Sequence, residues 1–129
     1  MYFELLSLEI HASMSGLNVI KPPYSKGKSG VDHRFSFLAS DDRLEYGFDI
    51  YEDTTQEEVL KTYTKKLDTE VCTFIVNLRG RPREESATLA NEYGITILGP
   101  AEIDSFFNWM KVGVEENIKG SSPPIGVSS

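Results

Sequence analysis

Two apolar segments, with a predicted helix between them, limit the folds that this sequence can adopt. Residues 71–78 read VCTFIVNL, and residues 95–98 read ITIL. Between them Pro82 stands near a helix start, and Gly94 stands just past the helix end. Strands that are apolar along most of their length are typical of parallel sheets covered on both faces. The segment therefore predicts a strand, a crossover helix and a second strand parallel to the first.

A helix and a short strand are expected at the start of the chain. Residues 3–15 fit both the strand and the helix period, but their length and the following Gly16 favour a helix. Residues 17–21 are expected to form a strand that ends at two prolines, and residues 24–30 to form a loop.

Residues 31–39 and 44–51 are predicted to pair as a hairpin. A turn symmetrical about its two consecutive aspartates would place Arg34 opposite Asp49, as a cross-strand ion pair on a polar face. The other face is expected to form the core, because nearly all its residues are apolar: His33, Phe35, Phe37, Ala39, Leu44, Tyr46, Phe48 and Ile50. The predicted fold is α/β, with a mixed central sheet flanked by helices. That sheet combines an antiparallel three-strand meander with the parallel strand–helix–strand unit.

A capping box opens the helix that follows the hairpin. Thr54 or Thr55 is the N-cap, a glutamate follows three residues later, and the helix is expected to run to about Leu67. Its spacing predicts an inner stripe of Val59, Leu60, Tyr63 and Leu67. Its lysines are expected to form a solvent-exposed face: Lys61, Lys65 and Lys66.

The last predicted helix begins after Pro100 and carries apolar residues at helical spacing. Trp109 widens this apolar face beside Phe106, so one candidate arrangement is a homodimer through the C-terminal helix. Residues 119–129 are rich in Ser, Pro and Gly, and they are expected to form a flexible tail. Residues 1–118 are then expected to form a single domain.

Charge and cysteine content limit the partners and the compartment. The 13 basic and 20 acidic residues give a formal charge of −7, which argues against a dedicated nucleic-acid binder, although a local basic patch stays compatible with one. The single cysteine, Cys72, forms no intrachain disulfide and fits a buried thiol in a reducing compartment, so we expect a cytoplasmic protein. No stretch reaches the ~20 apolar residues of a membrane-spanning helix, so no membrane partner is expected.

Spacing argues against several common sites. GKSG at residues 27–30 precedes a predicted strand, not the helix that a phosphate-binding P-loop requires. No G-x-G-x-x-G follows a strand, and the two histidines give no zinc-binding pattern. Three arginines cluster where a strand ends and the crossover helix begins: Arg79, Arg81 and Arg83. Cations there can hold an anion, so a small anion-binding module is a weaker alternative, beside an ordinary basic loop.

The order of elements resembles the restriction-endonuclease-like superfamily, named for its PD-(D/E)XK motif, and especially its small archaeal endonuclease-like domains. The stretches that carry the resemblance are GKSGVDHRFSFLA, FDIYED, LDTE and LANEYGITILG. In an active member, an acidic residue on one hairpin strand and an acidic-x-Lys triplet on the next hold a divalent metal for phosphodiester attack. The resemblance places the first carboxylate at Ser36 and the triplet at Asp49, Ile50 and Tyr51.

Two of these motif positions depart from the family pattern. Only Asp49 keeps a carboxylate, whereas hydrolysis requires at least two hard oxygen ligands for Mg²⁺ and a cation. Because the motif is degenerate at Ser36 and Tyr51, the resemblance implies a nuclease-like domain that has no catalytic activity and needs no cofactor. Such a domain would serve in binding, regulation or assembly. The alternative is a divergent Mg²⁺-dependent nuclease acting on nucleic acid, in which Asp49 works with a migrated carboxylate and a migrated lysine such as Lys28.

Overall fold

The chain folds into an α/β structure built on a mixed five-strand sheet. The computed structural model describes residues 2–108. The elements, in chain order, are α1 (Tyr2–Met14), β1 (Asn18–Val19), β2 (Tyr24–Lys26), β3 (Asp32–Arg34), β4 (Phe37–Ser40), β5 (Glu45–Tyr51), α2 (Gln56–Asp68), β6 (Cys72–Asn77), α3 (Glu84–Glu92), β7 (Thr96–Leu98) and the 3₁₀ helix η1 (Pro100–Glu102). Residues 103–108 are also helical.

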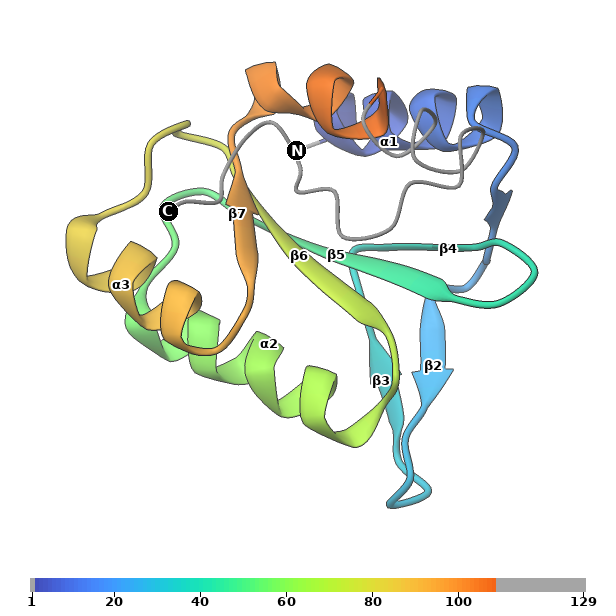
Figure 1. Cartoon of the computed structure of the whole chain (residues 1–129), viewed down its shortest axis with the longest axis horizontal. Helices are drawn as coiled ribbons and strands as arrows, with labels where there is room; N and C mark the ends of the chain where they lie inside the picture. Colours follow the sequence, from blue (N-terminus) through green and yellow to red (C-terminus); the bar gives the residue numbers. More distant parts are fainter. Residues whose placement is uncertain (1, 109–129) are drawn as a thin grey trace.

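The sheet confirms the mixed topology predicted from the sequence. Its strands lie in the order β1-β4-β5-β6-β7. β1, β4 and β5 pair antiparallel, whereas β5, β6 and β7 pair parallel. Figure 1 shows α1 and η1 on one side of the sheet and α2 and α3 on the other. Helices on both sides explain why β6 is apolar along most of its length.

Two hydrophobic cores fill the two sides of the sheet. The first lies under α1 and residues 103–108, with Phe48 of β5 contacting four aromatic rings at centroid distances of 5.0 to 6.0 Å: Phe37, Phe74, Phe106 and Phe107. The second lies under α2 and α3 and consists of Val59, Ile75, Ala90, Ile95 and Ile97. Residues that point to either side of β5 are therefore packed under helices.

Local signals set the ends of α1 and α2. The hydroxyl of Thr55 accepts the N–H of Glu58 at 3.2 Å, and the carboxylate of Glu58 accepts the N–H of Thr55 at 3.0 Å. α1 is followed by Gly16 at φ 82°, a conformation that side chains with a Cβ rarely adopt. The predicted capping box and the predicted helix at the start of the chain are both confirmed.

The register of the β4–β5 hairpin differs from the predicted one. Phe37 pairs with Phe48, whereas a turn centred on the two aspartates would have paired it with Tyr46. The cause is Asp41, whose N–H donates to the carbonyl of Leu44 at 3.0 Å and whose carboxylate accepts the N–H of Leu44 at 2.8 Å. This side-chain turn moves the centre of the hairpin by one residue, so the residues within β4 and β5 keep their predicted sides of the sheet. Leu44, which was expected in the core, is 46% exposed.

The predicted pairing of Arg34 with Asp49 is wrong. The strand expected over residues 31–39 is interrupted at Ser36, so β3 leaves the main sheet and pairs with β2, which had been expected to be a loop. Arg34 lies opposite Tyr24 in this separate hairpin, which projects from the sheet in Figure 1. Because of the bend, Phe35 joins a third cluster with Leu38 and Val71 and does not line the same face as Phe37.

The inner face of α2 also differs from its prediction. Leu60 and Leu67 are 45% and 59% exposed. Thr62 is fully buried instead, together with Val59. The helix therefore directs polar as well as apolar side chains toward the sheet, and these polar groups require partners there.

The expected C-terminal interface is only partly within the described residues. Phe106 is fully buried in the first core, so its ring is not available on the surface for a dimer contact. Trp109 and the tail predicted over residues 119–129 lie outside the described residues. Among the helices of residues 2–108, none has the length and apolar character needed to cross a membrane.

Candidate functional site

Asp49 is the centre of the candidate site. It lies on β5, on the side covered by α2, and it is 3% exposed. Nζ of Lys65 lies 2.7 Å from Oδ2 of Asp49 and 2.8 Å from Oδ1. The hydroxyl of Thr62 donates to Oδ2 at 2.7 Å. Two side chains of one helix therefore neutralise and hydrogen-bond the buried carboxylate.

Lys65 is turned inward, so the prediction of a solvent-exposed lysine is wrong at this position. Its side chain is 17% exposed, and its ammonium group also donates to the carbonyl of Arg34 at 2.7 Å. The same group stands 4.6 Å from the centre of the Phe35 ring. Thr62 and Lys65 are three residues apart on α2, so they share the helix face that covers β5.

Tyr51 borders the same pair. Its hydroxyl lies 3.1 Å from Oγ1 of Thr62 and 3.4 Å from Oδ2 of Asp49. Burial, and then the negative charge of Asp49, raise the pKa of Tyr51 above its ordinary value. The phenol therefore stays neutral near pH 7 and supplies a hydrogen bond, not the positive charge that a lysine would bring to this motif position.

Ser36 lies at the bend between β3 and β4, beside the strand that carries Asp49 and Tyr51. Its N–H donates to the carbonyl of Phe48, and its hydroxyl accepts the N–H of Ile50, both at 3.0 Å. The three motif positions therefore meet in one region. Ser36 supplies a backbone-binding hydroxyl there, where the family pattern has a carboxylate.

These side chains do not fit a Mg²⁺ site. Mg²⁺ requires several oxygen ligands in near-octahedral geometry, and the ammonium group of Lys65 repels a cation at the Asp49 carboxylate. Within residues 2–108, no three His, Cys, Asp or Glu side chains gather in a metal-binding group. Lys28, considered above as a migrated lysine, lies 3.9 Å from Glu70.

The three arginines of the sequence cluster lie in different environments. Arg83 contacts Oδ2 of Asp53 through Nη2 at 3.0 Å and Nε at 3.1 Å, and this hydrogen-bonded carboxylate raises the pKa of Arg83. Arg79 is exposed, and its backbone N–H donates to the carbonyl of Glu52 at 3.0 Å. Arg81 lines a pocket between α3 and β7. The three arginines therefore do not form a single anion site.

A polar cluster that the sequence did not indicate joins the tip of the β2–β3 hairpin to the end of α2. The carboxylate of Asp68 accepts two hydrogen bonds from Ser29, one from the hydroxyl at 2.5 Å and one from the backbone N–H at 2.9 Å. Oδ2 of the same carboxylate lies 2.7 Å from Nε2 of His33. These contacts, that of the Ser29 hydroxyl first, lower the pKa of Asp68 to about 2. A Cβ on Gly27 would lie 1.9 Å from Oδ2 of Asp68. We call these four residues the Asp68 latch.

Asn77 is a buried polar residue that the sequence pattern placed only within an apolar strand. It is fully buried at the end of β6. Its Oδ1 accepts both the N–H and the hydroxyl of Thr54 at 2.7 Å, and its Nδ2 donates to the carbonyl of Gly80 at 3.3 Å. Asn77 thus connects β6 to the start of α2 and to the loop that precedes α3.

Comparison with known proteins supports the fold and leaves the family open. No family model and no curated protein matches the chain. A crystal structure described as a "Protein of Unknown Function AF1548" is similar, with a TM-score of 0.59 and 20% sequence identity. The similarity covers 76% of this chain and 57% of that one, so the chain spans little more than half of that neighbour's length. At this identity the likeness shows a shared fold, the α/β arrangement described above.

Proposed function

We propose that this chain is a nuclease-like domain of the PD-(D/E)XK type that has lost metal-dependent cleavage and serves in binding, regulation or assembly. The observation that carries the proposal is the contact of Lys65 with Asp49. Three further features support it: the order of the elements, the place of Asp49 on β5, and the positions of Tyr51, whose hydroxyl contacts that aspartate, and of Ser36, whose hydroxyl accepts the N–H of the neighbouring Ile50.

The chemistry of the pair favours a structural role for Asp49. A carboxylate that is 3% exposed is out of reach of a phosphodiester, and its oxygens already accept bonds from Lys65 and Thr62. Displacing the lysine would leave an ammonium group and a carboxylate without partners in a partly buried region, which is strongly unfavourable. The Asp49–Lys65 pair therefore acts as a fixed contact between α2 and β5.

A metal titration tests this proposal. Mn²⁺ added to ¹⁵N-labelled protein broadens the amide signals near any site it occupies, and Asp49→Asn provides the matched control because it keeps the side-chain shape. We expect the amides of Ser36, Asp49 and Ile50 to show no broadening that depends on Asp49, and we expect no Mg²⁺-dependent cleavage of DNA or RNA. Broadening or cleavage that disappears in Asp49→Asn would contradict the proposal.

The second candidate is a divergent Mg²⁺-dependent nuclease, and one observation favours it. Lys65 brings a cation to the carboxylate of Asp49, as the enzyme hypothesis requires, although from α2 and not from the strand. This candidate predicts that both Asp49→Asn and Lys65→Met abolish cleavage in the presence of Mg²⁺. The same titration and cleavage assay distinguish the two candidates.

A further inference from the structure

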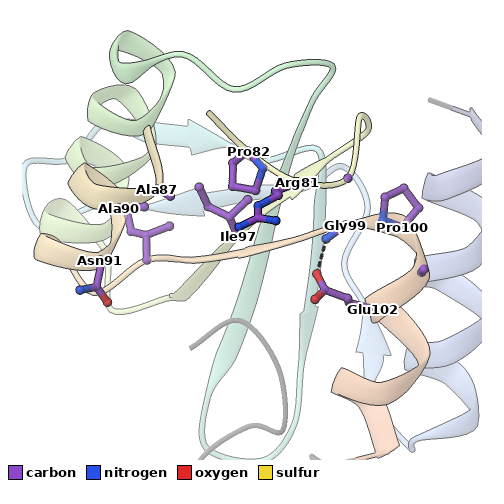
Figure 2. A pocket seen from close by; sticks show the side chains of 12 residues that line it. Arg81, Pro82, Ala87, Ala90, Asn91, Ile97, Gly99, Pro100 and Glu102 are labelled. Carbon is purple, nitrogen blue, oxygen red and sulfur yellow. Dashed lines mark hydrogen bonds between the residues drawn. The ribbon is translucent and has the colours of Figure 1, made fainter. Parts of the chain in front are cut away.

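A second region of the molecule has the form of a ligand site. A pocket of about 560 Å³ lies between α3 and β7, with walls from the segments that follow β6 and β7 (Figure 2). This volume falls within the roughly 300–1,000 Å³ of typical small-molecule sites. The pocket follows the length of β7, from Ile95 before the strand to Gly99 after it, and only its end near Gly80 and Gly99 lies beyond the carboxyl ends of β6 and β7. None of its lining residues belongs to the Asp49–Lys65 pair.

The pocket combines an apolar wall with one cation. Ala87 and Ala90 of α3 and Ile97 of β7 contribute aliphatic side chains, and Arg81 contributes a guanidinium group (Figure 2). Among residues 2–108, Arg81 has no carboxylate partner, whereas Arg83, two residues later, is paired with Asp53. An unpaired guanidinium beside apolar walls is suited to bind a carboxylate or phosphate through two parallel hydrogen bonds.

The backbone around Arg81 is held by close packing of two loops. A Cβ on Gly99 would lie 3.1 Å from Cα of Gly80, so the loops after β6 and β7 approach each other more closely than most side chains with a Cβ would fit without a small shift. Gly80 has φ 91°, and its carbonyl accepts the amide of the buried Asn77. These contacts fix the residue that precedes Arg81, which reduces the ordering that a ligand must impose.

Glu102 places a negative charge at one end of the pocket. Its Oε1 accepts the N–H of Gly99 at 2.7 Å, as Figure 2 shows, so the carboxylate is held at the end of the pocket formed by η1. Its negative charge repels an anion most strongly at that end, so the anionic group of a ligand is expected beside Arg81. Glu102 therefore limits the affinity for anions and helps to fix where the anionic group lies.

We propose that this pocket binds a small organic anion, a carboxylate or a phosphate monoester, with its charged group on Arg81 and an aliphatic body against Ala90 and Ile97. Both anions present the paired oxygens that a guanidinium recognises. The site is independent of the Asp49–Lys65 pair, so it stands or fails separately from the function proposed above.

Titrations followed by ¹H–¹⁵N spectra test the site, with hexanoate, hexyl phosphate, inorganic phosphate and 1-hexanol as probes. We expect hexanoate or hexyl phosphate to shift the amides of Gly80, Ile97 and Gly99 with a dissociation constant on the order of 1 mM. A response to hexanoate alone identifies a carboxylate site, and a response to hexyl phosphate alone identifies a phosphate-ester site. Inorganic phosphate and 1-hexanol are each expected to bind at least about tenfold more weakly, because each lacks one of the two recognised parts.

Three variants assign the binding to this pocket. Arg81→Gln should weaken the binding of the organic anion about tenfold or more, because it removes the charge. Arg79→Gln removes a nearby exposed arginine that does not line the pocket, and it should leave the affinity within a factor of about two. Glu102→Gln keeps an acceptor for the N–H of Gly99 and removes a negative charge, so it should tighten anion binding about threefold.

Several results would overturn the proposal. One is the absence of saturable shifts at these amides with either organic anion at about 20 mM. Another is equal binding by wild type and Arg81→Gln, which would show that the guanidinium does not hold the ligand. Equal binding of 1-hexanol and hexanoate would contradict the anionic part, and equal binding of inorganic phosphate and hexyl phosphate would contradict the aliphatic part.

Discussion

The ammonium group of Lys65 lies 2.7 Å from the carboxylate of Asp49, between α2 and the third strand of a sheet covered on both sides. Removing one member of such a pair leaves the other charged group without its partner in a region of low water content. We therefore expect Lys65→Met to lower the free energy of unfolding by about 3 kcal/mol, the lower end of the usual range because the lysine side chain is 17% exposed.

Chemical denaturation of Lys65→Met and of a control variant on the same helix measures this effect. Lys61 is exposed, and Lys61→Met should change the free energy of unfolding by less than about 0.5 kcal/mol. Equal stability of the two variants would mean that the Asp49–Lys65 pair contributes nothing to folding.

The Asp68 latch should respond to acid at an unusually low pH. Its hydrogen bonds to Ser29 and His33 lower the pKa of Asp68 from about 3.8 to about 2 in the folded protein. A lowered pKa means that the contribution to stability is present above the unfolded value and is lost as pH falls from about 4 through about 2. The amide signal of Ser29, followed against pH, should therefore titrate near pH 2. In Ser29→Ala, the Asp68 carboxylate signal should titrate closer to 3.8, and an unchanged midpoint would contradict the role of that hydroxyl.

Gly27 should tolerate alanine only when Asp68 is removed. A Cβ at this position would lie 1.9 Å from Oδ2 of Asp68, which is held by three hydrogen bonds and is not free to move aside. We expect Gly27→Ala to destabilise the protein by about 1–3 kcal/mol. In the Asp68→Ala background the same change should have little further effect, because the clash is gone. Additive losses in the double-mutant cycle would contradict this.

Asn77 should be more sensitive to substitution than its place in an apolar strand indicates. Asn77→Ala leaves the N–H and hydroxyl of Thr54 and the carbonyl of Gly80 without a side-chain partner, and we expect a loss of about 3 kcal/mol in the free energy of unfolding. Asn91→Ala, at an exposed position of α3, is the control and should stay within about 0.5 kcal/mol of wild type. A small effect of Asn77→Ala would mean that water replaces these hydrogen bonds.

The elements with strong local signals were predictable from the sequence. The capping box of α2, the helix before Gly16 and the parallel strands β6 and β7 all follow from residues close together in the chain. The register of β4 and β5 did not follow, because the side chain of Asp41 closes the turn one step beyond the position that symmetry indicated. The bend at Ser36 was also missed, because the apolar alternation continues through it.

The candidate site was only half predictable. Asp49 was identified on its strand, but its partner was assigned to the hairpin and not to α2. The apolar β6 requires helices on both sides of the sheet, so an aspartate on a neighbouring strand is buried and requires a cation from the covering helix. Thr62 and Lys65 share the helix face of Val59, which is the signal that indicates them.

The two outer strands of the main sheet are short: β1 has two residues and β7 has three. In the part of the chain that the structure describes, the borders of the sheet therefore present few free backbone groups to another molecule. Long, flat borders are the ones that recruit further strands and seed fibrils. The same sheet that encloses Asp49 and Lys65 at its centre thus offers, at β1 and β7, little length of strand edge to which another chain could pair.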